Sequence, residues 1–163
     1  MLVTILTDAS RCPDTGASGY GYWIASGRGK RPGGAVLGEG GRTPCITTAE
    51  MMAVANALTV AINAGLVQRG DDVLVQSDST AATDTLKGRH SRHVCGVTDK
   101  MVEVKEYVRR LALEHDLTLE YRHVKAHTGR QDARSLANEH CDRRAKKFMR
   151  EVRRAIRVRE GAN

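Results

Sequence analysis

The chain has 163 residues, of which 40% are apolar and 4% aromatic, so it is long enough for one domain with an aliphatic core. No apolar run approaches the ~20 residues of a membrane span, and we expect no signal peptide and no membrane contact. The four cysteines are widely spaced and match no zinc pattern, so we expect reduced thiols and a cytoplasmic location.

The formal net charge of +7 is concentrated at one end of the chain. Residues 143–163 contain nine Lys or Arg and two Asp or Glu, and the rest of the chain is formally neutral. A concentrated positive surface attracts the phosphate backbone of nucleic acids. The alternative interpretation is a solvated helix face that ends in a frayed tail.

The first part of the chain is predicted to form three β-strands. Residues 2–8 are nearly all apolar or threonine, which is typical of a central strand, and residues 18–26 alternate in the manner of a half-buried strand. Residues 27–34 are rich in glycine and predict a turn, so the third strand is expected at about 35–40.

The remainder of the chain is predicted to alternate between helices and strands. The apolar stripe of a helix begins near residue 48 and ends before Gly65. The expected elements are a helix at about 48–64, a strand at 71–78, a short helix at 79–87, a helix at about 99–114, a strand at 117–124 and a helix at about 134–159. This order predicts an α/β fold.

Four acidic residues lie at or near the ends of these elements. Asp8 ends a strand and could form an Asx turn, and Glu50 could complete a capping box with Thr47. Asp78 could cap the following helix, whereas Asp142 lies inside a helix and has no capping role. A cluster of carboxylates at one point usually binds divalent metal, and two such metals are a standard means of cutting a phosphodiester.

Five motifs in register resemble the type 1 ribonuclease H family, in its form without a basic handle helix. The similarity runs from residue 2 to about 148. The matching segments are Thr7-Asp8-Ala9-Ser10 followed by Gly19-Tyr20-Gly21-Tyr22, Thr48-Ala49-Glu50-Met51-Met52-Ala53, Ser77-Asp78-Ser79, Val124-Lys125-Ala126-His127-Thr128-Gly129 and Asn138-Glu139-His140-Cys141-Asp142.

The resemblance implies a ribonuclease H-like fold: a five-stranded mixed sheet with its first three strands antiparallel and helices on both faces. It implies a catalytic domain at residues 1–148, and we expect a basic helical extension at 149–163. The implied activity is metal-dependent hydrolysis of RNA in an RNA–DNA hybrid, leaving 5′-phosphate and 3′-hydroxyl ends. The implied cofactor is a pair of Mg²⁺ ions, for which Mn²⁺ could substitute, and the expected state is a monomer.

The resemblance also assigns roles to individual residues. Asp8 would bridge two ions, Glu50 and Asp78 would hold one of them, Asp142 the other, and His127 would assist proton transfer or product release. Further residues are expected to contact nucleic acid: Ser10, Cys12, Thr47, Thr48, Thr80, Arg153 and Arg154.

The chain departs from the family where the 2′-hydroxyl is read. Ile46 and Thr47 stand where many members carry amides, and Thr80 stands where a glutamine is common. The 2′-hydroxyl distinguishes RNA from DNA, so a DNA-directed nuclease or resolvase of the same fold remains an alternative. A non-catalytic nucleic-acid-binding domain is the third hypothesis, although an unused carboxylate cluster would only reduce stability.

Overall fold

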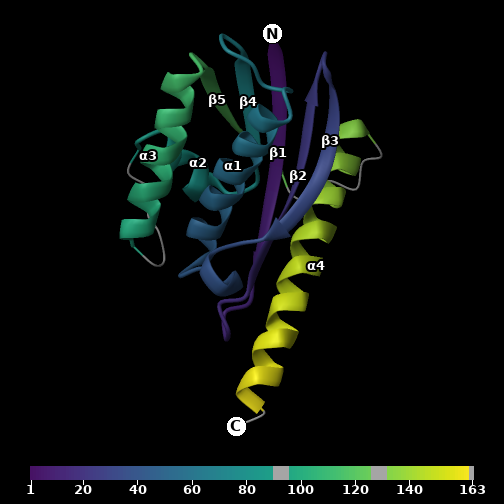
Figure 1. The fold of residues 1–163 in the computed structure, drawn as a ribbon, viewed down its shortest axis with the longest axis vertical. Helices are drawn as coiled ribbons and strands as arrows, with labels where there is room; N and C mark the ends of the chain where they lie inside the picture. The colour runs from purple at the N-terminus through teal and green to yellow at the C-terminus, as the bar shows by residue number, and fades with distance from the viewer. Residues whose placement is uncertain (90–95, 126–131, 162–163) are drawn as a thin grey trace.

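The structure is a computed structural model that describes residues 1–89, 96–125 and 132–161 (Figure 1). No helix in these ranges is both long enough and apolar enough to cross a membrane. The elements in chain order are β1 (Leu2–Arg11), β2 (Ser18–Ser26), β3 (Gly29–Val36), the 3-10 helix η1 (Glu39–Gly41), α1 (Ile46–Asn63), β4 (Asp72–Ser77), α2 (Thr80–Leu86), α3 (Asp99–Glu114), β5 (Thr118–His123) and α4 (Ala133–Gly161).

The five strands form one mixed sheet in the order β3-β2-β1-β4-β5. Strands β1, β2 and β3 pair antiparallel, whereas β4 pairs parallel with both β1 and β5. The parallel β1–β4 pair lies at the centre of the sheet, and Val3, Ile5, Val73 and Val75 are fully buried there. The predicted α/β fold, with its first three strands antiparallel, is confirmed.

Helices cover both faces of the sheet, as Figure 1 shows. Helices α1, α2 and α3 lie on one side and α4 on the other. Alternate residues of β1 serve the two sides: Ile5 belongs to the large core that includes α1, and Leu6 to a smaller cluster with Cys141 of α4. This alternation follows from the period of two along a strand.

The predicted bounds of the third strand are wrong. The prediction was a turn at 27–34 and a strand at about 35–40, but β3 spans Gly29–Val36 and only the residues before it turn. Pro32 pairs with Trp23, and Gly33 with Tyr22, in the antiparallel ladder. Because β3 is an edge strand, it tolerates a proline that a central strand would exclude.

Helix α4 approaches β2 closely because β2 carries glycines on the contacting face. A Cβ atom at Gly19 would lie 2.6 Å from the Met149 backbone nitrogen, and one at Gly21 would lie 2.2 Å from the Cys141 carbonyl oxygen. Ala145 of α4 is fully buried between these two contacts. We call this contact between β2 and α4 the glycine seam, and it fixes the height and rotation of α4 on the sheet.

The C-terminal half of α4 is anchored to the domain. Met149 and Ile156 are buried with Cys12 and Ala17 of the β1–β2 connection, and Val152 packs against them. Arg42 donates a hydrogen bond from Nη2 to Glu160 Oε1 at 3.0 Å. The expected boundary between residues 148 and 149 therefore falls inside one continuous, packed helix.

The cysteines differ in state. Cys12 and Cys141 are buried free thiols, as expected from the sequence. Cys45, at the start of α1, is disulfide-bonded, so the expectation of a reduced thiol is wrong at this position. Cys95 lies outside the described residues.

Candidate metal centre

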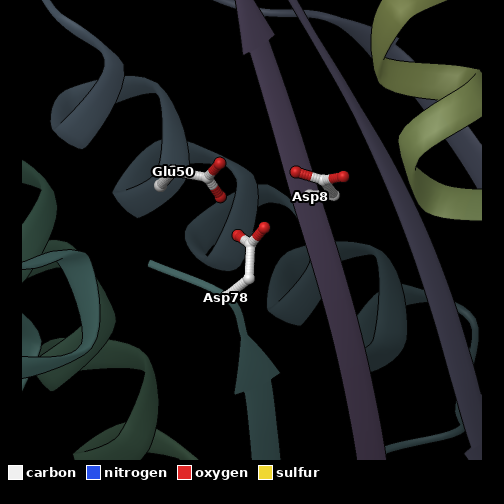
Figure 2. A group of neighbouring side chains, drawn as sticks. All are labelled: Asp8, Glu50 and Asp78. Atoms are coloured by element: carbon white, nitrogen blue, oxygen red, sulfur yellow. The ribbon is translucent and has the colours of Figure 1, made fainter. Parts of the chain in front are cut away.

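Three carboxylates from three separate elements converge at the centre of the sheet (Figure 2). Asp8 lies within β1, Glu50 in the second turn of α1, and Asp78 directly after β4. One oxygen from each carboxylate lies within 4.8 Å of the others. The structure thus brings together three of the four acids that the sequence singled out.

Glu50 faces inward and does not cap its helix. Helix α1 begins at Ile46 with Cys45 as N-cap, so Glu50 is beyond the capping position and the capping-box alternative with Thr47 is wrong. The Glu50 side chain is 4% exposed, and Oε1 accepts a hydrogen bond from the Ala9 backbone N–H at 3.1 Å. Among the described residues, the buried Oε2 atom has no hydrogen-bond partner.

Asp78 is likewise not used as a cap. The N-cap of α2 is Ser79, whose Oγ accepts a hydrogen bond from the Ala82 backbone N–H at 3.2 Å. The capping alternative for Asp78 is therefore wrong, and its carboxylate extends toward Asp8 and Glu50 instead.

His123 contacts this segment and was not identified from the sequence. Its Nε2 lies 3.0 Å from the Asp78 carbonyl oxygen, within hydrogen-bond range. His123 ends β5 directly beside Ser77 at the end of β4. The parallel pairing of β4 and β5 would have identified His123, because parallel strands end at the same edge of the sheet.

The carboxylates hold one another in an unfavourable electrostatic environment. Burial, and then the charges of Asp78 and Asp142, raise the pKa of Asp8 to about 7. Burial, and then Asp8 and Asp78, raise the pKa of Glu50 well above its usual range. Such shifts show that the ionised cluster lacks enough positive charge nearby.

Asp142 lies near the three carboxylates but has a cation of its own. It acts on Asp8 through its charge, yet it is outside the group whose oxygens lie within 4.8 Å. Lys146 Nζ lies 2.8 Å from Asp142 Oδ2, one helical turn along α4. The Asp142 side chain is 19% exposed, so it is more accessible to solvent than Glu50.

The donor set fits a hard divalent cation. Carboxylate oxygens are the ligands that Mg²⁺ prefers, and the unpartnered Glu50 Oε2 is a buried acceptor without a donor among the described residues. A bound cation would satisfy this oxygen and supply the missing positive charge.

The residues expected to contact nucleic acid are differently exposed. Ser10, Thr80, Arg153 and Arg154 present surface to solvent. Cys12 is 4% exposed, Thr47 7% and Thr48 0%. These three side chains offer little or no surface to a strand, so we leave them out of the interface proposed below. His127 lies outside the described residues.

Solved structures of similar fold include several ribonucleases H. RNase H1 from the halophilic archaeon Halobacterium salinarum NRC-1 aligns with a TM-score of 0.68 and 21% identity, covering 93% of this chain and 99% of its own. The N-terminal RNase H domain of rv2228c from Mycobacterium tuberculosis gives 0.66 and 20%, covering 91% and 99%.

LC11-RNase H1, solved in complex with an RNA/DNA hybrid, aligns with a TM-score of 0.62 and 16% identity, covering 91% of this chain and 97% of its own. No curated protein shows significant similarity to the chain. The RNase H family matches residues 2–150, which is most of the sequence. The carboxylate cluster and this match agree, and the chain belongs to the RNase H family.

Proposed function

We propose that this ribonuclease H hydrolyses the RNA strand of RNA–DNA hybrids with two Mg²⁺ ions, leaving 5′-phosphate and 3′-hydroxyl ends. The observation that carries the proposal is the convergence of Asp8, Glu50 and Asp78 in a chain of the RNase H family. The hybrid-bound LC11-RNase H1, which shares the fold, supports the choice of substrate.

The four carboxylates would hold the ions as follows. Asp8 would be shared by both, Glu50 and Asp78 would complete one site, and Asp142 would contribute to the other. Bound Mg²⁺ lowers the pKa of an attacking water and stabilises charge on the leaving oxygen. Mn²⁺ has similar oxygen preferences and is expected to substitute.

The protein's own contribution is to orient these ligands. The Ala9 N–H holds Glu50 Oε1, so one oxygen of this carboxylate is fixed and the other remains available. The N-cap Ser79 and the contact of His123 with the Asp78 carbonyl fix the backbone immediately after the Asp78 Cα atom. Lys146 pairs with Oδ2 of Asp142 and partly neutralises the charge that Asp142 would offer to an ion. We propose that His127 assists proton transfer or product release.

The substrate is proposed to be an RNA–DNA duplex held by Ser10, Thr80, Arg153 and Arg154, all of which present some surface to solvent. We propose that the protein acts as a monomer. The expectation of a cytoplasmic location without membrane contact stays a prediction.

The decisive experiment is a cleavage assay on end-labelled substrates in Mg²⁺. A hybrid is compared with RNA duplex, DNA duplex and both single strands, and the chemistry of the product ends is determined. We expect cleavage of RNA in the hybrid, and its loss on chelation. Cleavage of DNA duplex in preference to hybrid would instead establish the DNA-directed alternative, and absence of all cleavage would leave a binding domain.

The matched control for this assay is Asp72→Asn. Asp72 is exposed at the start of β4, whereas Asp78 follows the end of the same strand. Each substitution removes one carboxylate charge, so a difference between Asp72→Asn and Asp78→Asn reports position and not net charge.

A further inference from the structure

We infer that one face of α4 is a rigid phosphate-binding track that grips the substrate duplex on one side of the cleavage position. This track, called here the arginine stripe, consists of Arg150, Arg153, Arg154 and Arg157. The inference deepens the proposed function, because it assigns a backbone-binding surface to the same substrate.

The four arginines line one hollow on the surface of α4. Together with Val158 they line a shallow hollow of about 370 Å³ that contains no acidic side chain. Arg150, Arg154 and Arg157 are exposed, and Arg153 is half-buried. Within the described part of the chain, none of the four forms an ion pair with a carboxylate within 4 Å.

The spacing of the stripe concentrates positive charge in an unfavourable way. Its members are three or four residues apart, so their side chains are neighbours on the helix surface. Like charges at these spacings destabilise an isolated helix. Nearby acids are used elsewhere: Glu151 pairs with Lys147, and Glu160 with Arg42. An external anion would supply the partner that the exposed Arg150, Arg154 and Arg157 lack among the described residues, whereas the half-buried Arg153 interacts with the Cys12 side chain.

The helix that carries the stripe is held rigidly. Its opposite face buries Met149 and Ile156 against the β1–β2 connection, and Gly41 of η1 leaves room for Val152. A Cβ atom at Gly41 would lie 2.7 Å from Val152 Cγ1, so the contact is close. The arginines therefore project from a fixed support and not from a frayed tail.

The arginine stripe lies on the same side of α4 as Asp142. From Asp142, the residues Lys146, Arg150, Arg153 and Arg157 follow at intervals of four, four, three and four, which keeps them on one side of the helix. At 1.5 Å per residue, the stripe lies ~12 to ~22 Å along α4 from Asp142. Each strand of a duplex presents one phosphate per ~3.4 Å of axis, so a span of ~10 Å matches about three phosphates.

The surface fits a nucleic-acid backbone better than a small anion. Several guanidinium groups in line recognise repeated phosphates, and Arg is suited to two hydrogen bonds per phosphate. Because the stripe extends from Asp142 in one direction only, its contacts lie to one side of the cleaved bond. Duplex added on that side should strengthen binding, and duplex added on the other side should not.

The test uses Arg150→Gln, Arg154→Gln and Arg157→Gln together, which spares the half-buried Arg153. Glutamine keeps helix propensity while removing charge. The matched control is Lys100→Gln, Arg109→Gln and Arg110→Gln on α3, on the opposite side of the sheet, where the side chains are 41%, 65% and 63% exposed. Both sets remove three positive charges.

Binding is measured in the Asp78→Asn background, so that it does not depend on cleavage. The probes are hybrids with one short cleavable stretch, the rest of the RNA being 2′-O-methylated, and with duplex extended on the 5′ or the 3′ side. Loss of the stripe should raise Kd about 10-fold and reduce the slope of log K against log salt by about 2 to 3, and the α3 set should change neither as much.

The length dependence gives the decisive outcome. The protein with an intact stripe, in the Asp78→Asn background, should bind more tightly when the duplex is extended on one side only. The stripe variant should not show this increase in affinity. Unchanged Kd and salt slope in the stripe variant, or equal effects of the α3 substitutions, would overturn the inference. Binding to phosphatidylserine vesicles is measured in parallel. If the stripe variant loses vesicle binding but keeps duplex binding, the inference is also overturned. If the protein binds as expected but never cleaves hybrid, the proposed function fails and the stripe stands.

Discussion

Gly21 of β2 and Cys141 of α4 are in contact through their backbones, because a Cβ atom at Gly21 would lie only 2.2 Å from the Cys141 carbonyl oxygen. Gly21 pairs with Asp8 in the β1–β2 ladder, and Cys141 immediately precedes Asp142. The absence of one side chain therefore brings the fourth carboxylate close to the other three.

Gly21→Ala is expected to push α4 away from the sheet at this point. Overpacking costs about 1–3 kcal/mol, and here the obstacle is backbone, which cannot rotate away. We expect a lower Tm and a large loss of cleavage in Mg²⁺, measured by calorimetry and turnover. Gly161→Ala is the control, because its Cβ would meet nothing within 4 Å. Equal effects of both substitutions would contradict the role of the glycine seam.

Asp78→Asn is expected to abolish cleavage and leave the fold intact. The substitution removes one charge from a cluster in which Asp78 raises the pKa of both Asp8 and Glu50. Without metal, relief of this repulsion should hold or raise the Tm, whereas Mg²⁺ should no longer raise it. Parent-like turnover by the variant in Mg²⁺ would disprove the assignment of Asp78 as a ligand.

Metal binding should depend on pH around neutrality. The pKa of Asp8 is about 7 in the metal-free protein, so this carboxyl retains its proton between pH 4 and 7, where the unfolded chain has lost it. The contribution of Asp8 to metal-free stability therefore falls as pH rises through this range. Mg²⁺ requires the ionised form, so the Tm increase that it causes should grow from pH 5.5 to pH 8. A Tm increase independent of pH would refute this.

Asp71 should stabilise the fold through an ion pair far from the metal centre. It is 3% exposed and lies 3.1 Å from both Arg28 Nη2 and the Met1 amino group. Hydrogen bonds from Arg28, the Gln68 N–H and the amino terminus hold the pKa of Asp71 well below its usual range, although burial acts to raise it. Asp71→Asn should cost about 3 kcal/mol near neutral pH, because it leaves Arg28 without its partner.

The pH dependence gives a second test of this pair. A lowered pKa stabilises above the unfolded value of about 4 and is lost as pH falls below it. The stability difference between the parent and Asp71→Asn, from denaturant titration, should thus be constant above pH 5 and shrink toward pH 2. Asp72→Asn, at an exposed neighbour, should show no such difference.

The sequence predicted the elements well where periodicity and local stop signals agreed. Helix α3 has the expected bounds, and β2 likewise. The prediction failed at β3, where Pro32, Gly33 and Gly34 are typical of a turn. Their role is set by neighbours distant in sequence: a Cβ at Gly33 would lie 2.4 Å from the Tyr22 hydroxyl, and one at Gly34 would lie 3.1 Å from Arg144 Cβ. Tertiary packing, not local propensity, selects the strand.

The candidate site shows the same division. The order of the motifs identified the four acids. The alternative capping roles of Glu50 and Asp78 were excluded only by the structure, in which Cys45 and Ser79 occupy the N-cap positions. The Lys146–Asp142 contact lies one turn along a helix, so its spacing was visible in the sequence. The His123 contact depends on strand register, which a single sequence does not specify.

The position of α4 in the chain has a consequence for the order in which this protein is made. Every other described element precedes α4, yet α4 covers the face of β1 and β2 that bears Leu6 and supplies Asp142. A nascent chain that has exposed β1 to β5 outside the ribosome still lacks this helix. Because Asp142 is a proposed ligand, the proposed set of four carboxylates becomes complete only after α4 emerges, and we expect a growing chain to lack nuclease activity until then.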